Sequence, residues 1–274
     1  MHSIHTNILA MSALRSLNEH HAALASSLEK LSSGHRINRA ADDPAGLAVS
    51  EKMRADIRSS EVAVRNAQDG ISLIRTAEGA LHETHAMLNR MVELATRAST
   101  GIHSEESRKA LDDEFQQLKA EIDRTAKATT FNGKKLLDGS LSKGLGLQIG
   151  STADAYNRIN VKVKDMGAAA LGLNEWDLSC EKSSLKALEA VKEAINAVSE
   201  QRGSLGATEN RLGYTIRSLS AYIENLSDAE SRIRDTDMAK EMMNFTRSSI
   251  LAQAAQAMFA HANMLAQSVV SLLR

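Results

Sequence analysis

The sequence predicts a mainly α-helical fold: an elongated antiparallel helical bundle or coiled coil with a small β-hairpin region, in which the N- and C-terminal helices pair. Apolar residues recur three or four positions apart along most of the 274 residues. Aromatic residues make up only 3% and there is one proline, whereas Ala, Leu, Glu, Lys, Arg, Ser and Gln dominate, as in long helices. Turn-forming glycines cluster in one section, at about 131–180.

A first helix is expected at residues 4–31, which carry a single apolar stripe. Its members are Ile4, Ile8, Met11, Leu14, Leu17, Leu24, Leu28 and Leu31. Gly34 is a suitable helix end, because glycine readily adopts the left-handed conformation that follows many helices. Asp43 and Pro44 form a helix start, since the carboxylate accepts free N–H groups and proline has none to lose. A polar, basic link therefore separates two helices.

The second helix is expected from Asp43 to about Ala98, a length typical of a rod. Gly70 and Gly79 lie inside it, and each costs about 1 kcal/mol relative to alanine. Ser104 then caps a third helix. The apolar stripe of this third helix is Leu111, Phe115, Leu118, Ile122 and Ala126.

The turn-rich section begins at Asn132 and Gly133. Beyond it, apolar residues alternate with other residues in two short segments, at Leu145, Leu147 and Ile149 and at Ile159, Val161 and Val163. Alternation with a period of two, between turns, predicts one or two small hairpins. We expect no other β structure in the chain.

Helix is expected again from about Ser184, with interruptions at Gly203 and Gly206. The apolar residues that follow have heptad spacing, which predicts supercoiled partners: Leu212, Ile216, Leu219, Ile223, Leu226 and Ile233. A joint at 235–237 precedes the last helix. The two ends of the chain mirror each other, and a chain that goes out and returns along helices brings them together.

The last helix carries no charge between Arg247 and Arg274, except where His261 is protonated. A membrane span is one interpretation, but its amide and hydroxyl side chains make insertion costly. A helix buried in a protein assembly fits better, because a helix that is apolar beyond one stripe must bury more than one face. The predicted assembly stripe is Leu251, Met258, Leu265, Val269 and Leu272.

Charge and cysteine content exclude several classes of protein. The formal net charge of −1 argues against a nucleic-acid partner. Cys180 is the single cysteine, which excludes an intrachain disulfide and any zinc site with two cysteines. Residues 1–20 lack the apolar core of a cleaved signal peptide, which leaves a cytoplasmic protein or export without cleavage.

Catalytic chemistry is not expected. The run from His82 to His85 resembles a zinc-protease motif, but that motif needs histidines four residues apart and here they are three apart. Phosphate-binding, dinucleotide-binding and serine-nucleophile motifs are absent from the sequence. We therefore expect no enzyme, no cofactor and no metal.

Several segments together resemble the bacterial flagellins. Residues 33–46 match the family's N-terminal signature S-G-x-R-I-N-x-A-x-D-D-x-A-G, residues 231–239 its C-terminal signature and residues 269–274 its usual ending. Further matches are residues 66–72, 78–81, 131–133 and 201–203. Two departures are the missing proline near the C-terminus, within 263–267, and Val92 where many relatives carry an arginine.

The resemblance implies a structural subunit that self-assembles into the flagellar filament for motility. It implies an extracellular location, in the filament, after export by the flagellar apparatus without a cleaved signal. Residues 1–42 plus 236–274 would form a terminal coiled-coil domain in the inner core of the filament, and residues 43–235 a rod domain. About fifty residues separate the two halves of the rod, too few for a large outer domain.

The partners that the resemblance implies are copies of the same chain, a flagellar export chaperone, and cap and hook-junction proteins. Host Toll-like receptor 5 is a further candidate partner, while nucleic acid and membrane are not expected. The hook–filament junction protein of the same superfamily is the alternative identity. A cytoplasmic signalling coiled coil is a third, but it would lack the paired end signatures.

Two further groups of candidate site residues follow. By resemblance, the receptor-binding candidates are Arg90, Leu94, Glu114, Asn89 and Glu93. The two polar links are predicted to form a connector between terminal helices and rod, with basic residues beside acidic caps. The connector candidates are Arg36, Asn38, Arg39, Asp42, Asp43, Asp235 and Asp237, with Arg232 and Arg234 as further basic partners.

Overall fold

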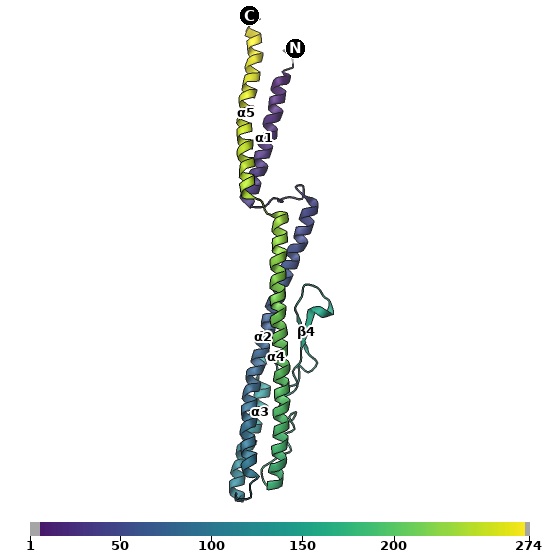
Figure 1. Cartoon of the computed structure of the whole chain (residues 1–274), viewed down its shortest axis with the longest axis vertical. Helices are drawn as coiled ribbons and strands as arrows, with labels where there is room; N and C mark the ends of the chain where they lie inside the picture. Colours follow the sequence, from purple (N-terminus) through teal and green to yellow (C-terminus); the bar gives the residue numbers. More distant parts are fainter. Residues whose placement is uncertain (1–5, 272–274) are drawn as a thin grey trace. The chain divides into compact units, whose positions relative to one another are not determined.

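The computed structural model describes residues 6–271 and confirms the mainly α-helical fold (Figure 1). In the described part of the chain, long helices flank a short β region. The elements in order are α1 (Ile8–Ser33), α2 (Pro44–Ala98), α3 (Glu105–Ala128), β1 (Thr130–Phe131), β2 (Lys134–Lys135), β3 (Leu145–Gln148), the 3-10 turn η1 (Ala155–Asn157), β4 (Arg158–Val161), α4 (Glu181–Arg234) and α5 (Met238–Ser271).

The chain divides into two compact units. The first holds the described residues up to Ala55 and those from Glu224 onward, and the second is Asp56–Ile223. The helix ends at Ser33, Pro44, Arg234 and Met238 therefore all fall inside the first unit. The first turns of α2 and the last turns of α4 belong with the terminal helices because they contact the links between these helix ends.

In the first unit, α1 and α5 lie side by side and run antiparallel (Figure 1). Asn7 caps α1 by accepting a hydrogen bond from the Ala10 N–H, and its own amide donates to the Ala262 carbonyl at 3.0 Å. Gly34 ends α1 in the left-handed conformation, with φ of 74°. The expected pairing of the two terminal helices is thus present, and Gly34 stops α1 as predicted.

In the second unit, α2 runs antiparallel to both α3 and α4. Ion pairs join Arg75 to Glu209 at 2.9 Å and Glu78 to Arg202 at 3.5 Å, so higher numbers on α2 meet lower numbers on α4. One continuous core lies between these helices. Its fully buried members include Leu81, Leu88, Met91, Leu94, Phe115, Ile122 and Val191.

Two small hairpins form the two sheets of the described residues, in the expected section. The expectation of no other β structure is wrong, because an isolated antiparallel bridge joins His35 to Asp235. Asn132 and Gly133 both have positive φ, 48° and 75°, and form the tight turn between β1 and β2, a conformation that Asn-Gly favours. β3 and β4 pair antiparallel with Leu145 opposite Val161 and Leu147 opposite Ile159. Residues opposite each other share a face, so this apolar face packs onto the helical core.

Charged side chains on α3 hold the connection between β4 and α4. Asp112 and Asp123 accept hydrogen bonds from the backbone N–H groups of Leu178 and Ala168, at 2.9 and 2.7 Å. Lys119 lies between them and donates to the Asn174 and Trp176 carbonyls. Burial lowers the pKa of Lys119, and the neighbouring aspartates oppose that shift. The segment is thus attached through its backbone as well as through its side chains, since Leu173 and Leu178 are fully buried in the core.

The predicted interruption of α4 at Gly203 and Gly206 is wrong. α4 is continuous from Glu181 to Arg234. Each glycine costs about 1 kcal/mol in a helix interior, but Val198, Leu205 and Leu212 on the same helix are buried against the core. Packing of this face outweighs the local preference of two residues.

A membrane span was one interpretation of the last helix. None of the helices in residues 6–271 combines the length and the apolar character that a bilayer crossing requires.

Candidate functional site

The two links of the first unit, residues 34–43 and 235–237, pair through their backbones. His35 and Asp235 form an antiparallel bridge. The Arg36 N–H donates to the Arg234 carbonyl at 2.6 Å, and the Thr236 N–H donates to the Gly34 carbonyl at 2.9 Å. This single bridge and its two backbone hydrogen bonds, which we call the connector ladder, join the end of α1 to the start of α5, between residues 200 positions apart in the sequence.

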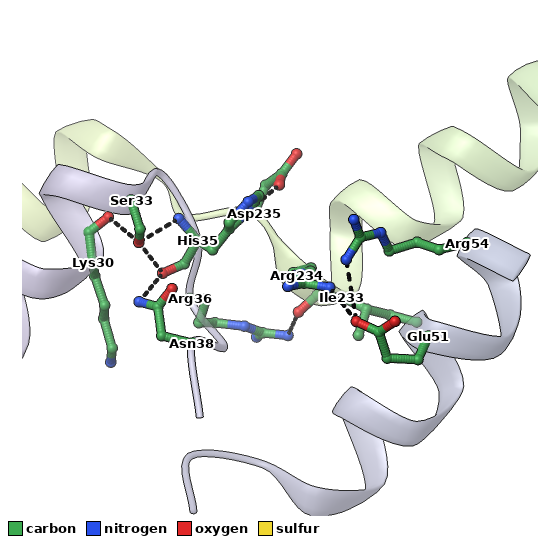
Figure 2. Close-up of polar contacts among 10 residues, drawn as sticks. All are labelled: Lys30, Ser33, His35, Arg36, Asn38, Glu51, Arg54, Ile233, Arg234 and Asp235. Atoms are coloured by element: carbon green, nitrogen blue, oxygen red, sulfur yellow. Dashed lines mark hydrogen bonds and ion pairs between the residues drawn. The ribbon is translucent and has the colours of Figure 1, made fainter. Parts of the chain in front are cut away.

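Side chains reinforce this ladder on both sides (Figure 2). The His35 ring Nδ1 lies 3.1 Å from the Asp235 carboxylate, and the Arg36 guanidinium donates to the Ile233 carbonyl. Ile37 is only 2% exposed, and its side chain lies close to Gly46 of α2, so an apolar side chain anchors the link. The Asn38 amide donates to the His35 carbonyl at 3.1 Å.

Three aspartates of the connector accept hydrogen bonds from backbone N–H groups rather than from arginine side chains. Asp43 accepts from the Gly46 N–H at 2.9 Å and Asp237 from the Lys240 N–H at 3.1 Å, so each caps the helix that follows its link. Asp42 accepts hydrogen bonds from the backbone N–H groups of Arg39 and Asn38. The bond from Arg39, followed by the bond from Asn38, is the main cause that lowers the pKa of the Asp42 carboxyl. Backbone N–H groups are thus the hydrogen-bond partners of these caps, while the nearby charges of Lys30 and Arg39 also help to lower the pKa of Asp42.

The arginines of the connector bind other groups. Arg39 makes a two-point ion pair with Glu29 at the end of α1, at 3.0 and 3.2 Å. Arg234, whose side chain is 16% exposed, pairs with Glu51 of α2 at 2.8 Å, and Arg54 reaches the same oxygen at 3.1 Å (Figure 2). The hydrogen bond from Arg234 is the main cause that lowers the pKa of Glu51.

Glu29, Glu51 and Ile233 were missed by the sequence reasoning. Glu51 lies 183 residues from Arg234, and a single carboxylate on a helix surface carries no signal of such a partner. The predicted pairing of the two links was the only indication of this contact in the sequence, because it brings the last turn of α4 close to the first turns of α2.

α5 has apolar side chains on faces that α1 does not cover. Its buried positions among the described side chains, Ala252 and Ala262, are small. The large apolar residues that are 41–66% exposed include Met238, Met242, Met243, Ile250, Leu251, Met258 and Met264. We call these seven the open face of α5. Of the predicted assembly stripe, Leu251 and Met258 belong to it and Leu265 is 55% exposed. Val269 lies within α5, and Leu272 lies outside the described residues.

Only part of the predicted apolar stripe of α1 is buried against α5. Ala10 and Ser27 are buried, whereas Ile8, Met11, Leu14 and Leu28 are 43–71% exposed. Small residues let two helix backbones approach closely, which suits the burial of Ala10 and Ser27. Leu17, Leu24 and Leu31 of the stripe are half-buried. α1, like α5, therefore exposes an apolar face.

In the second unit, three of the receptor-binding candidates, Arg90, Glu93 and Glu114, form one ion-pair network. Arg90 binds both oxygens of Glu114 on α3, at 2.8 and 3.3 Å, and Glu93 at 2.7 Å. Glu114 and then Glu93 raise the pKa of Arg90 above its ordinary value. Asn89 is exposed beside them, but Leu94 is fully buried. Leu94 therefore packs in the core of the second unit and has no exposed surface in the described subunit.

The groups considered for catalysis do not converge. In the described residues, no three His, Cys, Asp or Glu side chains are placed to hold a metal ion. Thr84, between the two histidines of 82–85, is buried and donates to its own helix at Ala80. Cys180 is exposed.

These features define a class of protein: a helical structural subunit whose termini pair and whose paired helices expose apolar faces to further chains. The comparisons identify the family. The model of the bacterial flagellin N-terminal helical region matches residues 4–142, and that of the C-terminal helical region matches residues 188–273. The chain belongs to the bacterial flagellin family.

Similar proteins agree over the whole length. The chain is 49% identical to flagellins of Halalkalibacterium halodurans and Bacillus subtilis, with 99% of each chain covered. It is 43% identical to a flagellar filament 31.3 kDa core protein of Treponema maltophilum, again with 99% of each chain covered.

Solved structures share the fold. A crystal structure of Bacillus cereus flagellin is 30% identical, with a TM-score of 0.51 over 57% of this chain and 88% of that one. A putative flagellar hook-associated protein from Vibrio parahaemolyticus has a TM-score of 0.61 over 71% of this chain and 100% of that one. At 11% identity the latter shows a common fold alone.

Proposed function

We propose that the chain polymerises with copies of itself into the flagellar filament, and that the open face of α5 is buried between these copies. The exposure of this face carries the proposal. Four of its members, Met242, Met243, Ile250 and Leu251, line one hollow together, and monomeric proteins rarely leave a large contiguous apolar surface uncovered. Burial contributes about 25 cal/mol for each Å² of apolar area removed from water, so the face favours association. Identity of 49% to flagellins supports the filament subunit over the hook–filament junction protein.

Acidic substitutions on the open face test this function. Ile250→Glu with Met258→Glu places two charges where apolar side chains are 60% and 63% exposed. Exposed sites tolerate such changes within about 0.5 kcal/mol, so α1 and α5 should stay paired. Sedimentation and electron microscopy should show no filaments, while far-UV circular dichroism stays unchanged.

The matched control is Leu185→Glu, the same apolar-to-acid change at a site on α4 that is 48% exposed. It should polymerise as the unaltered chain does. Normal filaments from the Ile250→Glu and Met258→Glu variant would contradict the proposal.

We further propose the division of the filament subunit into a terminal domain, 1–42 plus 236–274, in the filament core, and a rod domain, 43–235. The paired links hold the terminal helices through a backbone ladder, a buried Ile37 and ion pairs, which suits a connector that contacts neighbouring subunits. Export would proceed through the flagellar apparatus without cleavage, with a chaperone, cap and hook-junction proteins as partners. The intact mass of subunits from shed filaments tests export, since a shortened N-terminus would contradict it.

Recognition by host Toll-like receptor 5 is a second proposed function of the surface around Arg90. The ion pairs of Arg90 with Glu93 and Glu114 fix a charged surface across α2 and α3. Arg90→Ala should weaken receptor binding, measured by surface plasmon resonance, and leave the fold intact. Val92 beside it favours weaker binding than in relatives with a second arginine.

Leu94→Ala is the necessary comparison for receptor binding. Leu94 has no exposed surface, and removing a buried leucine side chain costs about 2–5 kcal/mol. A loss of binding in this variant should therefore accompany a loss of stability. Unchanged receptor binding of a folded Arg90→Ala variant would refute the assignment.

A further inference from the structure

Methionine is concentrated on α5. The chain has 11 methionines, and five of them, Met238, Met242, Met243, Met258 and Met264, lie on this helix. All five are exposed, from 48% to 66%, and all belong to the open face. In the second unit, by contrast, Met91 is fully buried and Met166 is 3% exposed.

The surroundings of these thioethers are largely apolar, with Thr246 and Arg247 as polar neighbours of Met242 and Met243. Met242 and Met243 line a hollow of about 510 Å³ together with Thr246, Arg247, Ile250 and Leu251. Met258 and Met264 lie in the stretch from 248 to 265, which contains no Asp, Glu, Lys or Arg. A polar group introduced at these positions would have no charged neighbour on its own helix within this stretch to pair with.

Peroxide chemistry introduces such a group. The thioether sulfur attacks one oxygen of hydrogen peroxide, the O–O bond breaks, a sulfoxide S=O forms and water leaves. Sulfur is oxidised by two electrons and the peroxide is reduced by two. An apolar, flexible side chain becomes a polar one, and enzymatic reduction restores the thioether.

We propose that the open face of α5 is a redox-sensitive assembly surface, in which methionine oxidation of the free subunit blocks polymerisation. This inference rests on the proposed burial of that face between copies of the chain. A buried sulfoxide without a hydrogen-bond donor carries the desolvation cost of an unpaired polar group. Subunits already in a filament should resist the same oxidant, because their neighbours cover the methionines.

The first experiment uses the full chain with Cys180→Ser, which removes the single thiol as a competing target. Peptide mass spectrometry after hydrogen peroxide treatment should find one added oxygen at each α5 methionine in free subunits, and little at Met91 and Met166. The oxidised subunits should need a free concentration at least about tenfold higher to polymerise, the change expected from one unpaired polar group at the interface. Filaments treated after assembly should show slower oxidation on α5.

The second experiment replaces all five α5 methionines by leucine in the same background, a change of similar volume. This variant should polymerise with or without peroxide. Met11 on α1 is 59% exposed and stays methionine, so continued inhibition by peroxide would show that the block arises elsewhere and would overturn the inference. If the leucine variant does not assemble, methionine sulfoxide reductase applied to oxidised Cys180→Ser subunits decides: restored assembly supports the inference, and no recovery overturns it.

The outcomes separate the two proposals. Failure of the untreated chain to polymerise contradicts the filament function itself. Normal polymerisation of both untreated and fully oxidised chain leaves that function intact and refutes the redox sensitivity of the open face.

Discussion

Two glycines of α2, Gly70 and Gly79, occupy the same helix in opposite environments. A Cβ at Gly70 would lie 2.4 Å from Leu147 Cδ1 of β3 and 3.3 Å from Leu212 Cδ1 of α4. A Cβ at Gly79 would meet no atom within 4 Å. Gly70 therefore allows the β3–β4 hairpin and α4 to approach α2, whereas Gly79 has no such contact in the chain.

Substitution by alanine should separate these roles. Both variants gain about 1 kcal/mol of helix preference. Gly79→Ala should therefore stabilise the chain by about 1 kcal/mol. In Gly70→Ala the Leu147 side chain must move, and overpacking costs about 1–3 kcal/mol, which cancels or exceeds the gain. The difference between the two variants, about 1–3 kcal/mol, isolates the contact because the helix preference is common to both.

Urea unfolding of freshly dissociated subunits, followed by far-UV circular dichroism, measures this difference. Leu147→Ala provides the decisive background, because it removes the atom that the new Cβ would strike. In that background Gly70→Ala should stabilise the chain about as much as Gly79→Ala does. If Gly70→Ala in the unaltered chain is already as stable as Gly79→Ala, the close approach of β3 to α2 is refuted.

The connector offers two more predictions. The double variant Arg36→Ala with Arg39→Ala removes exposed contacts worth about 0–1 kcal/mol each. The free energy of unfolding of the monomer should therefore change by no more than about 2 kcal/mol, while electron micrographs should show altered filament shape or assembly. A large fall in monomer stability would place these residues in the core of the folded chain. Asp42→Ala should lower stability at neutral pH, because a carboxyl whose pKa is lowered in the folded state stabilises it above its ordinary pKa of about 3.9 and loses that contribution as the pH falls through the lowered value. The gap between the two proteins in thermal unfolding should therefore close in acid, and a gap that is constant from pH 7 to pH 2 would contradict the role of the Asp42 charge.

Much of this fold could be predicted from local sequence. The apolar period of three to four residues identifies the helices, since it depends only on helix geometry. Gly34, Asp43 and the Asn132-Gly133 turn act through their own backbone conformation or neighbouring N–H groups, so they take the predicted roles. The stretch of α5 after Arg247 has no Asp, Glu, Lys or Arg and predicted a helix with more than one apolar face, and Ile250, Met258 and Met264 in this stretch are exposed.

Tertiary structure alone decided which groups meet. The pairing of Arg234 with Glu51, the burial of Leu94 beneath Arg90 and the contact of α1 through Ala10 rather than Met11 all depend on how each helix is rotated about its axis. An exposed ion pair contributes too little energy to impose that rotation. The close packing of many buried side chains imposes it instead, and that sum over distant segments cannot be read from any one stretch of sequence.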